Sequence, residues 1–148
     1  MTVLVALVTG AAVTSCNREG EGPGPGSGAM VPADKLPAEF YGAWRFQGAS
    51  GGMDGQGNAG YRVEKIVIGD GNTLEEHRPG GVVTRDTFTP GRGKSIFSTE
   101  DVWQIRRKKN PMIEVLTLTT NGDLTMSENV YDGFSYSFKK ADPPLRRR

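Results

Sequence analysis

Hydrophobic and polar residues alternate with a period of two through most of the chain after residue 36. The clearest case is Phe134, Tyr136 and Phe138, which are separated by single serines. Such alternation places successive side chains on opposite faces, which predicts β-strands with one buried face. No segment keeps a helical period for more than two turns. The predicted strands cover residues 43–47, 61–68, 73–77, 82–89, 94–98, 102–108, 112–120, 124–126 and 134–138.

Turn-forming residues separate these segments. Glycine, proline, asparagine and aspartate supply the backbone conformations that tight turns require, and Asn-Gly is a strong hairpin signal. Eight or nine short strands with turns between them are typical of an all-β sandwich or an up-and-down barrel. The turn signals are Gly69-Asp70-Gly71-Asn72, Pro79-Gly80-Gly81, Pro90-Gly91-Arg92-Gly93, Asn121-Gly122 and Asp132-Gly133.

The first 15 residues differ from the rest. They carry no charge, and an apolar run at residues 3–8 is followed by small residues. The run is too short to cross a bilayer, which takes about 20 apolar residues. It predicts a secretory signal peptide over residues 1–15, although no Lys or Arg precedes the run.

Cys16 is the only cysteine, so a disulfide within the chain is excluded. Val13-Thr14-Ser15-Cys16 resembles a bacterial lipobox, and that resemblance implies diacylglyceryl and N-acyl lipid on Cys16 after cleavage. Residues 16–35 are then the acylated Cys and a flexible Gly/Pro-rich linker. If the protein comes from a Gram-negative bacterium, Asn17 implies that it is sorted to the outer membrane as an envelope lipoprotein, with its domain in the periplasm or on the cell surface.

Three short motifs resemble the small lipocalin-like lipoproteins of bacteria. They are Gly42-Ala43-Trp44, the loop 50–55, and the closing pair of segments 124–126 and 131–136. The resemblance implies a lipocalin-like antiparallel up-and-down β-barrel of eight to nine strands over residues 36–140. It also implies that Trp44 seals the closed end and that a basic residue packs over Trp44. Lys139 is the candidate for that basic residue.

Two functions stay open for such a barrel. An eight-stranded barrel has room inside for side chains or one small ligand. The first function is binding of a small apolar molecule, and the second is an interaction module of the envelope whose barrel is filled by its own side chains. The candidate lining is aromatic: Trp44, Phe46, Tyr61, Trp103, Phe134 and Tyr136.

The remaining candidates for chemistry are weak. His77 is the only histidine, and on a strand it shares its face with Glu75 and not with Glu76, so an exposed strand position is expected. The loop at 54–58 lacks the later acid of a calcium loop. The basic run 106–109 predicts a solvated edge or turn, with anionic headgroups as the alternative.

No nucleophile-and-base set or phosphate-binding glycine loop is visible, so we expect a protein that is not an enzyme and has no metal or cofactor besides the lipid on Cys16. Lys and Arg number 18 against 17 Asp and Glu, a balance that gives no sign of a nucleic-acid partner. We expect a monomer held at the membrane by its lipid, with residues 141–148 as a disordered basic tail.

Overall fold

The alternating segments form nine β-strands in the computed structural model, which describes residues 29–52 and 60–141. Two single-turn 3₁₀ helices, η1 (Ala38–Phe40) and η2 (Pro79–Gly81), accompany the strands. The strands are β1 (Val31–Pro32), β2 (Gly42–Gly51), β3 (Lys65–Gly69), β4 (Thr73–His77), β5 (Val83–Ser95), β6 (Ser98–Arg107), β7 (Ile113–Leu118), β8 (Leu124–Glu128) and β9 (Phe134–Lys140).

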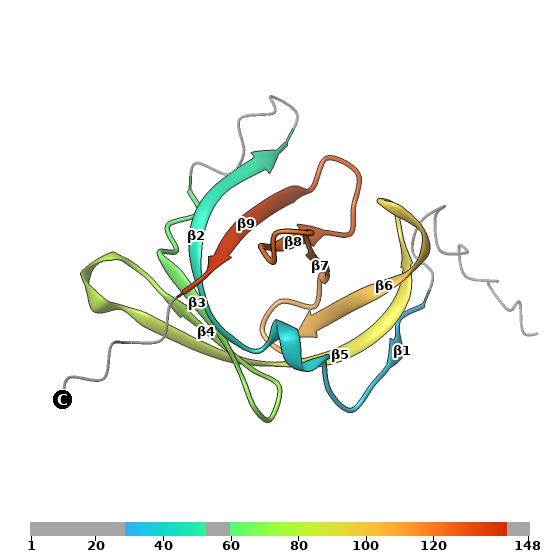
Figure 1. The fold of residues 1–148 in the computed structure, drawn as a ribbon, viewed down its shortest axis with the longest axis horizontal. Helices are drawn as coiled ribbons and strands as arrows, with labels where there is room; N and C mark the ends of the chain where they lie inside the picture. Colours follow the sequence, from blue (N-terminus) through green and yellow to red (C-terminus); the bar gives the residue numbers. More distant parts are fainter. Residues whose placement is uncertain (1–28, 53–59, 142–148) are drawn as a thin grey trace, which may run out of the picture.

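Strands β2 to β9 close into a barrel (Figure 1). Each pairs antiparallel with the next strand in the chain, and one further pairing, β2 with β9, completes the ring. The all-β up-and-down barrel is therefore confirmed, and the sandwich is excluded. Closure pairs the strand edges that would otherwise be exposed. Strand β1 lies outside the ring and pairs with β5.

The predicted turns are confirmed at most positions. Gly71 and Asn72 have φ of 73° and 57° between β3 and β4, and Asp132 has φ of 61° before β9. The Asn-Gly turn closes with the Gly122 N–H donating to the Thr119 carbonyl at 2.9 Å. These are the left-handed conformations that Gly, Asn and Asp adopt at least cost.

The turn predicted at residues 90–93 is wrong, as is a separate strand at 94–98. Strand β5 continues through this stretch to Ser95, and the turn follows it. The glycines serve a close approach: a Cβ on Gly91 would lie 2.5 Å from the Val31 carbonyl oxygen, and one on Gly93 would lie 2.9 Å from Gln104 Oε1. No side chain fits beneath the N-terminal segment here.

Strand β3 is shorter than predicted, because residues 61–64 are not part of it. Its pairing with β2 ends at Arg45–Lys65, next to a bulge in β2 between Phe46 and Gly48. Tyr61 therefore reaches the interior from a loop and not from a strand.

Residues 29–35 pack on the barrel, although the linker was expected to extend through residue 35. Met30 is buried, Val31–Pro32 form β1, and the Ala33 N–H donates to the Pro90 carbonyl at 2.9 Å. The hydrogen bonds and buried surface give this segment a fixed place beside β5.

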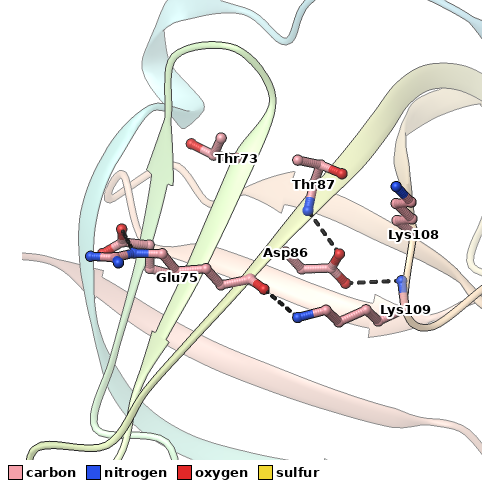
Figure 2. A pocket seen from close by; sticks show the side chains of 7 residues that line it. Thr73, Glu75, Asp86, Thr87, Lys108 and Lys109 are labelled. Carbon is pink, nitrogen blue, oxygen red and sulfur yellow. Dashed lines mark hydrogen bonds and ion pairs between the residues drawn. The ribbon is translucent and has the colours of Figure 1, made fainter.

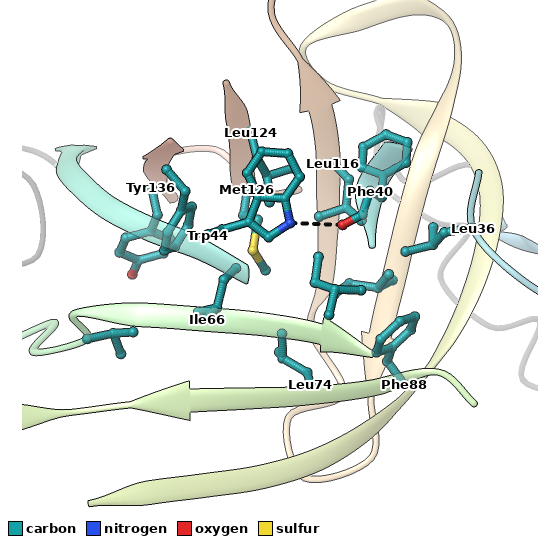
Figure 3. Close-up of a cluster of buried hydrophobic side chains, with 14 residues drawn as sticks. Leu36, Phe40, Trp44, Ile66, Leu74, Phe88, Leu116, Leu124, Met126 and Tyr136 are labelled. Carbon is teal, nitrogen blue, oxygen red and sulfur yellow. Dashed lines mark hydrogen bonds between the residues drawn. The ribbon is translucent and has the colours of Figure 1, made fainter. Parts of the chain in front are cut away.

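The barrel core is densely apolar at the end covered by η1, which we call the closed end (Figure 3). Leu36 and Phe40 lie over Trp44, whose Nε1 donates to the Phe40 carbonyl at 2.9 Å. Burial of such side chains contributes roughly 1.5–3 kcal/mol each. Four residues here and in the adjoining core have no exposed surface: Ile66, Ile105, Leu124 and Phe138.

Candidate functional site

Trp44 at the closed end lies beneath a lysine, but not the expected one. Lys140 Nζ is 4.3 Å from the centre of the Trp44 ring and donates to the carbonyls of Glu39 and Tyr41 at 3.0 and 2.9 Å. Lys139 was the candidate. The prediction was off by one residue because Lys140 is the register partner of Trp44 and therefore lies on its face of the sheet, whereas Lys139 points to the other face.

Aromatic side chains occupy the next layers of the interior, away from η1. Tyr61 stacks on Tyr136 with ring centroids 4.0 Å apart, and Phe46 lies 5.4 Å from Tyr61. Phe134 lies 6.4 Å from Tyr136 at the start of β9. Tyr136 is buried, but the other three are only partly buried. We call Phe46, Tyr61, Phe134 and Tyr136 the aromatic wall.

Three charged side chains from different strands meet in the same part of the interior. Arg107, at the end of β6, donates from Nε and Nη2 to the two carboxylate oxygens of Glu114 on β7, at 2.6 and 2.8 Å. Its Nη1 donates to Glu76 on β4. The exposed fractions of the Arg107, Glu76 and Glu114 side chains are 13%, 10% and 6%. We call these three residues the inner charged cluster.

The environment shifts the pKa values of this cluster in opposite directions. Burial raises the pKa of Glu76, but the charge and hydrogen bonds of Arg107 and Arg78 outweigh it, and the pKa lies below its usual range. Burial dominates for Glu114, whose pKa lies above its usual range despite Arg107. Glu114 is the more buried carboxylate and lies near the charges of Glu76 and Glu128, which raise its pKa, whereas Arg78 helps to lower the pKa of Glu76.

Tyr61 connects the wall to the cluster. Burial raises the pKa of its hydroxyl, and the charges of Glu76 and Glu114 raise it further while Arg107 opposes them. The hydroxyl therefore lies within the electrostatic field of all three charged residues and stays protonated in the neutral range. An apolar surface and a group of ionic hydrogen-bonding partners adjoin in one interior region.

All six aromatic residues predicted to line the barrel contact its core. Four of them form the aromatic wall, and Trp44 lies apart at the closed end. Trp103 lies at the edge of the core, with the Arg92 guanidinium carbon 5.3 Å from its ring centre. Sequence reasoning missed the inner charged cluster, although alternation with Leu74, Ile105 and Leu116 would have placed its members on inward positions.

The prediction that His77 shares its face with Glu75 agrees with the structure, but His77 is half-buried where an exposed position was expected. His77 Nε2 lies 3.3 Å from Glu75 Oε2 on the outer face, and Arg85 Nε donates to the same carboxylate at 2.7 Å. This pair with Arg85 lowers the pKa of Glu75. Glu76 points the other way, into the barrel. In the basic run 106–109, Arg107 also points inward, so the run is not a continuous basic surface.

A hollow of about 310 Å³ lies on the outer face between β4, β5 and the β6–β7 turn (Figure 2). Most of its charged groups already have partners, and Glu75 pairs with Arg85 at 2.7 Å. Asp86 accepts from the N–H groups of Thr87 and Lys109, and Lys109 Nζ donates to the Arg85 carbonyl at 2.7 Å. Since these partners are already engaged within the hollow, we place the candidate site in the interior instead.

Some predicted features lie outside the described residues: Cys16, the loop at 54–58 and the tail at 142–148. Across residues 29–52 and 60–141, no three His, Cys, Asp or Glu side chains are grouped so as to hold a metal ion. In those same ranges there is no helix with the length and apolar character needed to cross a membrane.

This chain matches no protein-family model, no curated protein and no solved structure.

Proposed function

We propose that the protein is a lipid-anchored protein of the bacterial envelope whose barrel binds a small apolar molecule. Cys16 within its lipobox-like sequence supports the anchor, and Asn17 supports the outer membrane. The observation that carries ligand binding is the aromatic wall, which keeps three partly exposed rings and whose Tyr61 lies within the electrostatic field of the inner charged cluster. Binding sites for small molecules combine apolar lining with a few placed polar groups in this way.

The inner charged cluster determines which polar group on a ligand the interior would favour. Arg107 is already bound by two carboxylates, so it has no unpaired charge to offer an anion. A carboxylate or phosphate would add to the two negative charges already present. An apolar molecule with a hydroxyl or an amine fits better, because carboxylates accept its hydrogen bonds and aromatic faces attract cations.

The second candidate function is an interaction module of the envelope that holds no ligand. The filled core favours it, since Ile66, Ile105, Leu124 and Phe138 have no exposed surface. The two functions differ in whether the aromatic wall is covered by a ligand or by the protein itself.

Native mass spectrometry separates them. A chain starting at Asn17 keeps every described residue and needs no detergent. A reproducible extra mass that is lost on denaturation supports the carrier, and so does a rise in melting temperature with decanol or decylamine but not with decanoate. At 100 times the dissociation constant the stabilisation is about 2.7 kcal/mol.

Tyr61→Ser tests the location of the ligand, and Tyr131→Ser on an exposed loop is the matched control. We expect the first change alone to abolish the rise in melting temperature. A bare chain mass, together with no response to any of the three compounds, would leave the interaction module.

The anchor is tested separately. The mature N-terminal peptide should carry a diacylglyceryl mass, and its processing should be sensitive to globomycin. A Cys16→Ser chain that stays in the membrane would contradict the anchor.

A further inference from the structure

Two loops meet on one part of the barrel surface. The Ile96 N–H, in the β5–β6 turn, donates to Asn129 Oδ1 at 3.0 Å, and Asn129 Nδ2 donates to the Lys94 carbonyl at 3.2 Å. The exposed apolar residues next to these bonds are Phe97, Val130 and Tyr131, with exposed fractions of 55%, 41% and 71%. We call these three residues the loop patch.

The chain enters the described domain beside this patch. The Ala29 carbonyl oxygen and Met30 Cα lie 3.4 and 3.2 Å from where a Cβ of Gly93 would be. Gly93 precedes Lys94, whose carbonyl joins the two loops. In Figure 1, β1 lies on the side of the β5–β6 hairpin, and the end of β9 lies across the barrel from it. Ala29, where the described domain begins, therefore lies on the patch side.

We propose that the loop patch contacts the surface of the membrane in which the protein is anchored. The proposal rests on the lipid anchor proposed above. Twelve residues lie between Cys16 and Ala29, so the entry point lies at most about 45 Å from the lipidated residue. Because the chain enters on this side, the patch side can reach the bilayer with less extension of the tether than the opposite side.

The chemistry of the patch fits the headgroup region. Phe has an apolar ring, and Tyr adds a polar hydroxyl to one. Aromatic side chains of this kind favour the membrane interface. The nearby charges do not favour anionic lipid: Lys94 is paired with Asp101 at 3.1 Å, and Asp132 follows Tyr131. The patch therefore suits a neutral or zwitterionic lipid surface.

The β4–β5 hairpin offers a matched control. Its exposed valines, Val82 and Val83, have exposed fractions of 56% and 40%. This hairpin projects on the opposite side of Figure 1 from β1. It is comparably apolar but lies far from the point where the chain enters.

The experiment uses full chains processed in a Gram-negative host and reconstituted in phosphatidylcholine vesicles. Tyr131→Cys and Val82→Cys are each labelled with a polarity-sensitive thiol dye, and a headgroup nitroxide lipid is added as quencher. We expect at least threefold stronger quenching at position 131, with a blue-shifted emission, and no increase when phosphatidylglycerol is added.

Equal quenching at the two positions, or stronger quenching at 82, would overturn the membrane-facing patch. Quenching at 131 that requires phosphatidylglycerol would overturn its neutral-lipid character. The unsubstituted chain distinguishes failure of the anchor: acylated Cys16 takes up no dye. If Cys16 of the unsubstituted chain is labelled, its thiol is not acylated, and the lipid anchor on which the membrane-facing patch rests is then excluded.

Discussion

Replacing Arg107 by methionine would leave two buried carboxylates without their shared cation. Arg107 makes three hydrogen bonds to Glu76 and Glu114, and the exposed fractions of all three side chains are 13% or less. Removing one partner of a buried ion pair costs about 3–5 kcal/mol. For a domain of this size that corresponds to a fall in melting temperature of more than about 10 °C.

The loss should depend on pH, and the sign follows from the carboxylates. Without Arg107, burial keeps the folded-state pKa of Glu114 above the unfolded value of about 4.3, whereas Glu76 still has Arg78 beside it. The penalty is then absent below that value and grows as pH rises toward neutrality. In the parent chain the lowered pKa of Glu76 acts oppositely: its stabilisation is present above the unfolded pKa and is lost as pH falls through the folded pKa.

Urea unfolding at pH 4 and pH 7, followed by tryptophan fluorescence, measures this difference without the screening that a salt denaturant brings. We expect Arg107→Met to lose about 3 kcal/mol or more at pH 7 and less than about 1 kcal/mol at pH 4. The control is Arg106→Met, an exposed neighbour on the other face, which should change little. A loss of the same size at both pH values would refute the argument from uncompensated buried charge.

Two further substitution pairs test local geometry by thermal unfolding. Lys140→Met should cost about 1–2 kcal/mol, because it removes a cation over an indole and two hydrogen bonds, whereas Lys139→Met should be neutral; equal effects would contradict the assignment of Lys140. Gly51→Ala should cost more than about 2 kcal/mol, since φ is +101° and a Cβ would lie 2.3 Å from the Gly133 carbonyl oxygen. Gly48→Ala, with nothing within 4 Å of its Cβ, should be tolerated, and a similar loss in both glycine variants would show that the close approach does not matter.

The strands were predictable where one face is uniformly apolar. Phe134, Tyr136 and Phe138 carry a period-two signal that only a half-buried strand satisfies, and β9 lies where that signal places it. The signal fails at residues 90–93, where Gly91 and Gly93 leave room for the segment at residues 29–31. Local sequence does not distinguish a glycine that turns the chain from one that makes room for another segment.

The inner charged cluster shows a second limit. Glu76 and Glu114 occupy inward positions by alternation, but composition alone favours placing carboxylates in solvent. Their burial depends on Arg107, which is 31 residues from Glu76 in sequence. Such a partner can be identified only when the register of β4, β6 and β7 is known. The alternating pattern therefore predicts which positions point inward, but not that charged residues are paired there.

The short strand β1 has a mechanical consequence. A force pulling on the chain before Ala29 reaches the two-residue β1–β5 pairing before it reaches the barrel. Breaking that pairing requires less work than opening the barrel, because Val31–Pro32, the bond from Ala33 and the buried Met30 side chain are the contacts that hold it. A force that is large enough to detach β1 from β5 would leave the closed ring of β2 to β9 intact. The N-terminal segment therefore detaches first and protects the barrel from unfolding under force.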